Sequence, residues 1–194
     1  MKNLLVKSSL ILALVSSAAL AQGAFFGGEG DYSFNSKIKT KNIASSEKNN
    51  FKKGHYGLGF YGGYDFDNYR AYGGYYYDFK ARKNAGESDA KWSKHKFLGG
   101  VDYTPSITEN FKAVLGGYTG LGYLSVRERF NNEISKKNFK GLLVGAKAGG
   151  IYSFDEHNAI EFGLKADKTF YKKNSGAQLR DTTIGIYTGY TYKF

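Results

Sequence analysis

A regular alternation of apolar and polar residues is the feature of this sequence that most limits how it can fold. In residues 26–34, apolar or small side chains occupy every second position, and Glu29, Asp31 and Ser33 lie between them. The same pattern returns in seven further segments, at 56–66, 69–79, 97–103, 111–123, 142–154, 160–166 and 182–194. Because successive side chains of a strand point to opposite faces, the pattern predicts eight β-strands, each with one apolar face.

The charged residues inside these segments, or one residue beyond their ends, all fall on the face opposite to the apolar one. They are Glu29, Asp31, Asp65, Arg70, Asp78, Asp102, Lys112, Lys147, Glu161, Lys165, Asp167, Asp181 and Lys193. Lipid excludes charge from the surface that it contacts, whereas side chains fill the interior of a barrel of eight strands. The sequence therefore predicts an all-β protein, an eight-stranded antiparallel up-and-down transmembrane β-barrel.

Carboxylates and cations that share a narrow lumen are expected to form ion pairs, because a buried charge persists only when it is paired. With inward tyrosines such as Tyr61, Tyr72, Tyr76 and Tyr118, they would form a packed polar plug. A narrow, gated ion path is the alternative. The predicted lumen charge network consists of Glu29, Asp31, Asp65, Arg70, Asp78, Asp102, Lys147, Glu161, Lys165, Asp167 and Asp181.

The connections between the predicted strands alternate between short and long. Short ones fall at 67–68, 104–110 and 155–158, and long ones at 36–54, 80–96, 126–138 and 168–178. Outer-membrane barrels have short periplasmic turns and longer outside loops. We therefore expect the long connections to face outward and both chain termini to lie in the periplasm.

The first 21 residues have the layout of a secretory signal. Lys2 and Lys7 supply the charge, residues 10–15 form an apolar run, and small residues precede Gln22. We expect cleavage after Ala21, which leaves residues 22–194 as one barrel domain. The sequence has no cysteine, so closure of the barrel would have to take the place of disulfides in the exported protein. The expected location is the outer membrane of a Gram-negative bacterium.

The carboxyl end carries a further pattern, in which a glycine precedes aromatic residues at alternating positions: Gly189, Tyr190, Tyr192 and Phe194. This resembles the terminal strand signal by which outer-membrane barrels are recognised by the barrel-assembly machinery. The chain from residue 22 onward also resembles the small eight-stranded barrels of the OmpA transmembrane domain, OmpX and opacity-protein type. That resemblance is architectural, and it implies a surface protein of the outer membrane.

Positive charge is concentrated in the long connections. The formal net charge is +11, and +9 without Lys2 and Lys7. Segments 36–54, 80–96, 126–140 and 168–180 together carry 21 basic and 5 acidic residues, whereas the remaining residues after the signal have a net charge of −7. We expect this basic loop surface to contact lipopolysaccharide phosphates or host polyanions, as an adhesin would. Its representative residues are Lys37, Lys39, Lys41, Lys52, Lys53, Lys172 and Lys173.

Other functions have less support in the sequence. Nucleic acid is not an expected ligand, because Trp92 is the one tryptophan that we place in an exposed loop and no stacking platform is evident. With no cysteine and three scattered histidines, we expect no metal or other cofactor. A monomer without enzymatic activity is the working hypothesis.

Two alternatives to a surface-binding protein remain open. One is a small pore for ions or small solutes. The other is a lipid A-modifying acyltransferase or hydrolase, for which His55, Ser88 and Asp89 would be the candidate residues in the outer loops.

Overall fold

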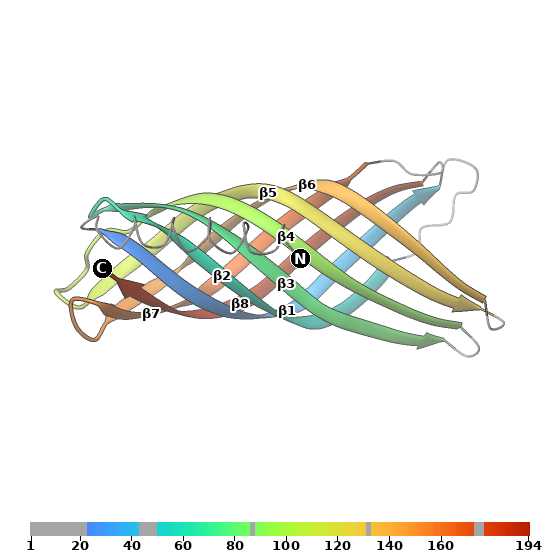
Figure 1. Cartoon of the computed structure of the whole chain (residues 1–194), viewed down its shortest axis with the longest axis horizontal. Coiled ribbons are helices and arrows are strands. Elements are labelled where there is room, and N and C mark those ends of the chain that lie inside the picture. Colours follow the sequence, from blue (N-terminus) through green and yellow to red (C-terminus); the bar gives the residue numbers. More distant parts are fainter. Residues whose placement is uncertain (1–22, 43–49, 86–87, 131–132, 173–176) are drawn as a thin grey trace, which may run out of the picture.

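The protein is a single closed antiparallel β-barrel in which each strand pairs with its neighbours in sequence (Figure 1). The computed structural model describes residues 23–42, 50–85, 88–130, 133–172 and 177–194, and it describes side chains for 23–34, 54–79, 92–126, 138–172 and 179–194. The strands are β1 (Ala24–Asn42), β2 (Asn50–Asp65), β3 (Tyr69–Ala85), β4 (Ser88–Tyr103), β5 (Phe111–Phe130), β6 (Glu133–Ser153), β7 (Asn158–Tyr171) and β8 (Ala177–Lys193). This confirms the predicted eight-stranded barrel.

Pairing between β1 and β8 closes the barrel. Phe26 lies opposite Tyr192, and the backbone N–H of Phe194 donates to the carbonyl of Ala24 at 2.9 Å. The carboxyl end therefore lies at the same end of the barrel as the start of β1 (Figure 1). No helix in the described part of the chain is long and apolar enough to cross a membrane.

The two faces of the barrel wall differ as the alternation predicts. Large apolar side chains are exposed on the outside of every strand, including Phe60, Val101, Leu115, Leu164 and Ile186. Buried polar and charged side chains occupy the inside. Because apolar side chains exposed in this continuous arrangement would be unfavourable in water, the outer wall is suited to lipid.

The strands extend well beyond the segments that the sequence predicted, and this corrects the expected long loops. Most of 36–54, 80–96, 126–138 and 168–178 continues as paired strand. The register shifts after Ser33 in β1 and after Asp78 in β3. At each place a β-bulge gives the strand one residue more than its partner. Each bulge shifts the phase of its strand by one residue, so a single alternation cannot be followed through it, while the hydrogen-bonded ladder continues.

The connections at 66–68, 104–110 and 154–157 are short and lie together at one end, which we call the turn end; the opposite end is the far end (Figure 1). Asp67 has a φ of +74° and is the centre of a γ-turn, in which the N–H of Asn68 donates to the carbonyl of Phe66. In the third turn, hydrogen bonds from Asn158 and His157 lower the pKa of Asp155.

Gly120 in β5 provides a test of how closely the strands approach. A Cβ at this position would lie 1.9 Å from the carbonyl oxygen of Phe97 and 2.9 Å from the Cα of Leu98. We expect Gly120→Ala to lower the free energy of unfolding by about 1–3 kcal/mol, because a backbone contact cannot move aside as a side chain can.

The matched control is Gly117→Ala in the same strand, where the nearest atom would be 4.0 Å away. Its effect should stay within about 0.5 kcal/mol. The measurement is the urea midpoint of the refolded protein in lipid vesicles, followed by gel mobility. Equal midpoints for the two variants would contradict the close approach of β4 and β5.

Candidate functional site

The interior of the barrel contains two main groups of ion pairs, one above the other. The lower group, nearer the turn end, joins Arg70 of β3, Asp102 of β4, Lys147 of β6 and Glu161 of β7. The guanidinium of Arg70 lies 2.7 Å from the carboxylate of Asp102 and 2.7 Å from that of Glu161. Lys147 lies 3.0 Å from each of the same two carboxylates. Four strands are thereby connected across the lumen by two cations and two anions.

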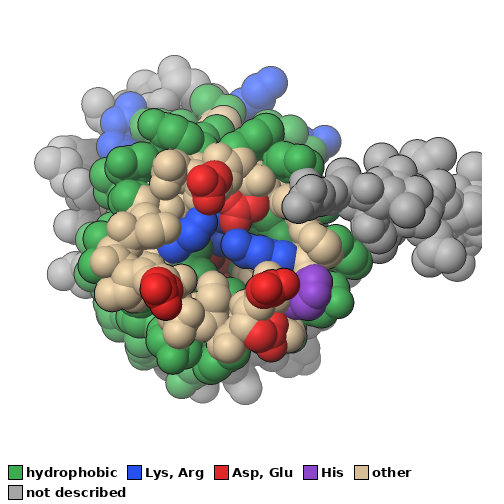
Figure 2. All heavy atoms as spheres, turned by 90° about the vertical axis from the view of Figure 1, so that its left-hand side faces the viewer, with side chains coloured by type: hydrophobic (Ala, Val, Ile, Leu, Met, Phe, Trp, Pro, Cys, Tyr) green, Lys and Arg blue, Asp and Glu red, His purple; other side chains and the backbone are tan. Residues whose placement is uncertain are grey.

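Seen from the turn end, basic side chains fill the centre with acidic ones beside them, inside a ring of hydrophobic side chains (Figure 2).

The upper group lies toward the far end and consists of His55, Asp78, Lys94, Lys96 and Asp181. Asp78 accepts a hydrogen bond from His55 Nε2 at 3.1 Å and lies 2.8 Å from Lys96 Nζ. Lys94 pairs with Asp181 and lies 3.9 Å from Asp78. All five side chains are buried.

Lys165 of β7 forms a third set of ion pairs. Its amino group lies 2.7 Å from Glu29 and 2.8 Å from Asp31, both on β1. Asp167 is buried in the same small hollow as Lys96 and Lys165. At the turn end, Asp65 pairs with Lys193 at 2.7 Å. The structure thus brings every predicted lumen residue to the inside of the barrel.

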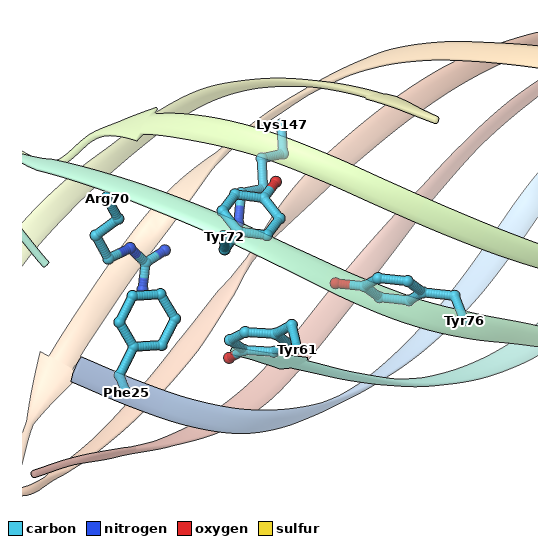
Figure 3. A pocket seen from close by; sticks show the side chains of 6 residues that line it. All are labelled: Phe25, Tyr61, Arg70, Tyr72, Tyr76 and Lys147. Atoms are coloured by element: carbon cyan, nitrogen blue, oxygen red, sulfur yellow. The ribbon is translucent and has the colours of Figure 1, made fainter. Parts of the chain in front are cut away.

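Aromatic rings fill the space between the charges (Figure 3). The guanidinium of Arg70 lies 5.4 Å from the Phe25 ring, and the Lys147 amino group lies 4.6 Å from the Tyr72 ring. Tyr61 donates to or accepts from Thr191 at 2.8 Å. The hollows that these inward side chains line have no room for a solute larger than about one water molecule.

A cluster of apolar side chains occupies the lumen beyond the upper group. It consists of Trp92, Leu124, Tyr171 and Leu179, all buried, with Val126 and Phe139 packed against it. Trp92 was expected in an exposed loop, and that prediction is wrong: the side chain is 8% exposed and lies inside the barrel. The reason is that β4 begins at Ser88, so Trp92 shares the inward face of Lys94 and Lys96.

Three residues of the upper group are not among the lumen residues that the sequence predicts. The alternation places Lys94 and Lys96 in a basic outer loop and His55 in the first loop, whereas all three lie inside the barrel. The alternation nevertheless indicates their side of the wall. Lys94 and Lys96 are an even number of residues from the inward Asp102, and His55 is an even number of residues from the inward Tyr61. They were missed because the strands were ended where the apolar alternation ends.

Exposed charges are separated between the two ends of the barrel. Among the residues whose side chains are described, the exposed acidic ones are Asp67, Glu109, Asp155 and Glu156, all at the turn end. The exposed basic ones are Lys140, Lys168, Lys172 and Arg180, all toward the far end.

The remaining residues of the predicted basic loop surface lie mostly in strands. Lys37, Lys39 and Lys41 belong to β1, Lys52 and Lys53 to β2, and their side chains lie outside the described part. Lys173 also lies outside the described residues.

The predicted assembly signal forms the end of β8. Tyr190 lies opposite Gly28, and Tyr192 lies opposite Phe26. Gly189 pairs with Glu29, and Phe194 follows the strand. Tyr190, Tyr192 and Phe194 are exposed on the outer wall. Recognition of this strand by the assembly machinery stays a prediction.

The residues considered for lipid A chemistry are not brought into an active-site arrangement in the described part of the chain. His55 is 5% exposed and bonded to Asp78, and the side chains of Ser88 and Asp89 lie outside that part. The described residues contain no group of three or more His, Cys, Asp and Glu side chains that could hold a metal ion.

No protein-family model matches this sequence, and no curated protein sequence matches it. Solved structures do match. Neisserial surface protein A is 16% identical, with a TM-score of 0.57 over 89% of this chain and 100% of that one. Ail, the attachment invasion locus protein of Yersinia pestis, was solved in complex with the heparin analogue sucrose octasulfate; it is 15% identical, with a TM-score of 0.52 over 88% of this chain and 99% of that one. The outer-membrane protease OmpT of Escherichia coli is 10% identical, with a TM-score of 0.52 over 88% and 97%. The chain therefore has the fold of small outer-membrane barrels, as the resemblance implied.

Arg70 allows the lower ion-pair group to be tested. Arg70→Met should lower the free energy of unfolding by about 3–5 kcal/mol, because it removes one of the two cations that neutralise Asp102 and Glu161 in a buried site. Adding Asp102→Asn should recover part of the loss, since Lys147 then still faces Glu161. Urea unfolding of the refolded protein in vesicles gives both values.

The control is Lys112→Gln, which removes a pair with Asp67 at 3.7 Å, where the Asp67 side chain is 91% exposed. An exposed pair contributes at most about 1 kcal/mol. If Arg70→Met cost no more than Lys112→Gln, the lower group would not have the stabilising role assigned to it.

Proposed function

We propose that this protein is a surface barrel of the Gram-negative outer membrane whose basic far end contacts phosphate- or sulfate-bearing polyanions outside the cell. The separation of exposed charge between the two ends is the observation that carries this proposal. In this orientation the acidic turn end and both termini face the periplasm. The basic far end faces the lipopolysaccharide layer, whose phosphates are negative.

The outer wall supports a membrane location. Exposed aromatic side chains occur at both edges of the apolar band, as aromatic girdles do at the two interfaces of a membrane barrel. Phe66 and Tyr69 stand near the turn end, and Tyr56 and Phe79 stand ten residues farther along the same strands. A protein that folds in water gains nothing from two such belts.

The filled lumen favours binding at the surface over passage through the barrel. Ion pairs, the aromatic rings around them and the apolar cluster at Trp92 occupy the described part of the lumen, and the hollow beside Lys96 and Lys165 has room for about one water molecule. Opening a path would require breaking buried ion pairs, which costs several kcal/mol. The alternative of a small pore therefore has less support than a surface role.

A polyanion ligand is compatible with what is known of one structural neighbour. Ail was solved with a heparin analogue, and that binding is a property of Ail. The present proposal rests on the charges of this chain. Because lysines act as separate point charges on long side chains, we expect the contacts to be distributed over several of them.

The test is retention of the refolded full chain on immobilised heparin and on immobilised lipopolysaccharide across a salt series. Replacing Lys37, Lys39, Lys41, Lys52 and Lys53 with Gln should weaken heparin retention by at least about tenfold at low salt. The difference should shrink as salt rises, because exposed charges are screened over about 8–10 Å at physiological ionic strength.

The matched control neutralises the other end, with Asp67 and Asp155 changed to Asn and Glu109 and Glu156 changed to Gln. This variant should bind as the unaltered protein does. If all three proteins were retained equally at every salt concentration, the basic far end would have no binding role.

A further inference from the structure

Four basic side chains form a cluster on the outer wall, on one side of the barrel. We call Lys140 of β6, Lys168 of β7, Lys172 after β7 and Arg180 of β8 the outward basic cluster. Each is exposed, and two of them, Lys168 and Arg180, lie over the ring of Phe170. Lys168 Nζ lies 5.2 Å from the centre of this ring, and the Arg180 guanidinium carbon lies 5.9 Å from it.

The backbone holds the cluster together. Phe170 lies opposite Arg180 in one ladder and opposite Leu142 in the other. The N–H of Lys172 donates to the carbonyl of Lys140 at 2.9 Å. The amino group of Lys140 lies 5.6 Å from the Tyr123 ring. Paired strands therefore fix the positions from which these four cations project.

The described residues supply no carboxylate partner for this cluster. None of the four cations forms an ion pair with a described acidic side chain, and the exposed acidic residues lie at the turn end. Cations that lie close together repel one another unless an anion is bound between them. The arrangement therefore favours an anionic ligand from outside the protein.

Among the residues whose side chains are described, the exposed cations lie on β6, β7 and β8 or directly after β7. On the described parts of β2, β3 and β4, the large outward side chains include Tyr56, Phe79 and Phe97, and the Tyr75 hydroxyl lies 2.7 Å from Nδ1 of His95.

The height of the cluster matches a membrane boundary. Residues along a strand tilted by about 40° rise roughly 2.5 Å each, so an apolar band about 25 Å tall takes about ten residues. We take Ile160 of β7 as the lower edge of this band. Lys168 is eight residues beyond Ile160, and Lys172, the residue after the end of β7, is twelve beyond it. Lys168 thus lies just below the upper edge of the band, and Lys172 just above it, with Phe170 between them.

We propose that the outward basic cluster is a binding site for the phosphate of an outer-leaflet glycolipid, the phosphorylated glucosamine headgroup of lipopolysaccharide. The phosphate would lie between Lys168 and Arg180, where the guanidinium can donate two parallel hydrogen bonds. Lys140 and Lys172 would contact it, or a second phosphate, from above. The acyl chains would run down the apolar wall below Phe170.

This inference rests on the proposed function, because it requires the far end to face outward. It assigns the lipid to a site separate from the lysines of β1 and β2. Soluble polyanions would contact the cations of the far end generally, the lysines of β1 and β2 included, as separate point charges. The lipid would bind only the wall of β6 to β8. Lipid binding and heparin retention should therefore respond differently to substitutions in the two places.

The test compares two variants of the refolded full chain, each with four basic residues replaced. The first changes Lys140, Lys168, Lys172 and Arg180 to Gln, and the second changes Lys37, Lys39, Lys41 and Lys52 to Gln. Native mass spectrometry in detergent measures binding of bisphosphorylated lipid A, with dephosphorylated lipid A and inorganic phosphate as further probes. Heparin retention is measured in parallel, and gel mobility verifies that each variant is folded.

The first variant should bind bisphosphorylated lipid A at least about tenfold more weakly and still be retained on heparin, because each surface cation contributes separately. The second variant should bind the lipid as the unaltered protein does and be retained on heparin more weakly. Dephosphorylated lipid A should bind the unaltered protein as weakly as the phosphorylated lipid binds the first variant.

Unchanged lipid A binding in the first variant would overturn the inference. Displacement of the lipid by millimolar inorganic phosphate would also overturn it, since the site would then bind soluble phosphate. If neither variant had weaker heparin retention than the unaltered protein, the proposed function alone would be contradicted. The lipid A comparison would still decide the inference. If the fourfold variant failed to fold, Lys168→Gln with Arg180→Gln would replace it, with the same expected direction.

Discussion

The rest of this structure depends on closure of the hydrogen-bond ladder. Lipid cannot satisfy backbone N–H and C=O groups, so a sheet that crosses a membrane must pair every strand on both sides. Here β8 meets β1 over almost the whole of both strands, from Phe25 opposite Lys193 to Asn42 opposite Ala177. Closing eight strands also fixes the width of the lumen, and that width determines what the inward residues can do.

A lumen this narrow brings charges from strands distant in sequence into contact. Arg70 and Glu161 are 91 residues apart in sequence and 2.7 Å apart in space. Most buried carboxylates and cations there lie beside a partner of opposite charge, which stabilises them, and aromatic rings fill what remains. The interior charges are consequently neutralised locally, which leaves the exposed charges at the two ends to determine how the molecule meets its surroundings.

The alternation predicted the fold and the inward face correctly because it records contact with lipid on one side of each strand. For the same reason it failed where the strands leave the lipid. Beyond the bulges after Ser33 and Asp78, the ladder continues through residues such as Lys37 and Lys39, which pair with Lys52 and Asn50, and no apolar alternation marks the strand there.

Lys94, Lys96 and Trp92 were therefore assigned to a loop, although they lie in the lumen. The particular pairings, such as Lys165 with Glu29 and Asp31, could not be predicted either. They depend on the stagger between strands around the whole barrel, which no local segment of sequence records.

If ion pairs and an apolar cluster fill the lumen, the molecule acts through its surfaces and does not conduct. Planar-bilayer recording of the purified refolded protein measures this. We expect a stable baseline without channel steps at physiological salt. Reproducible single-channel steps from the pure protein, reduced when Arg70 or Lys147 is neutralised, would contradict it and show that the lumen conducts.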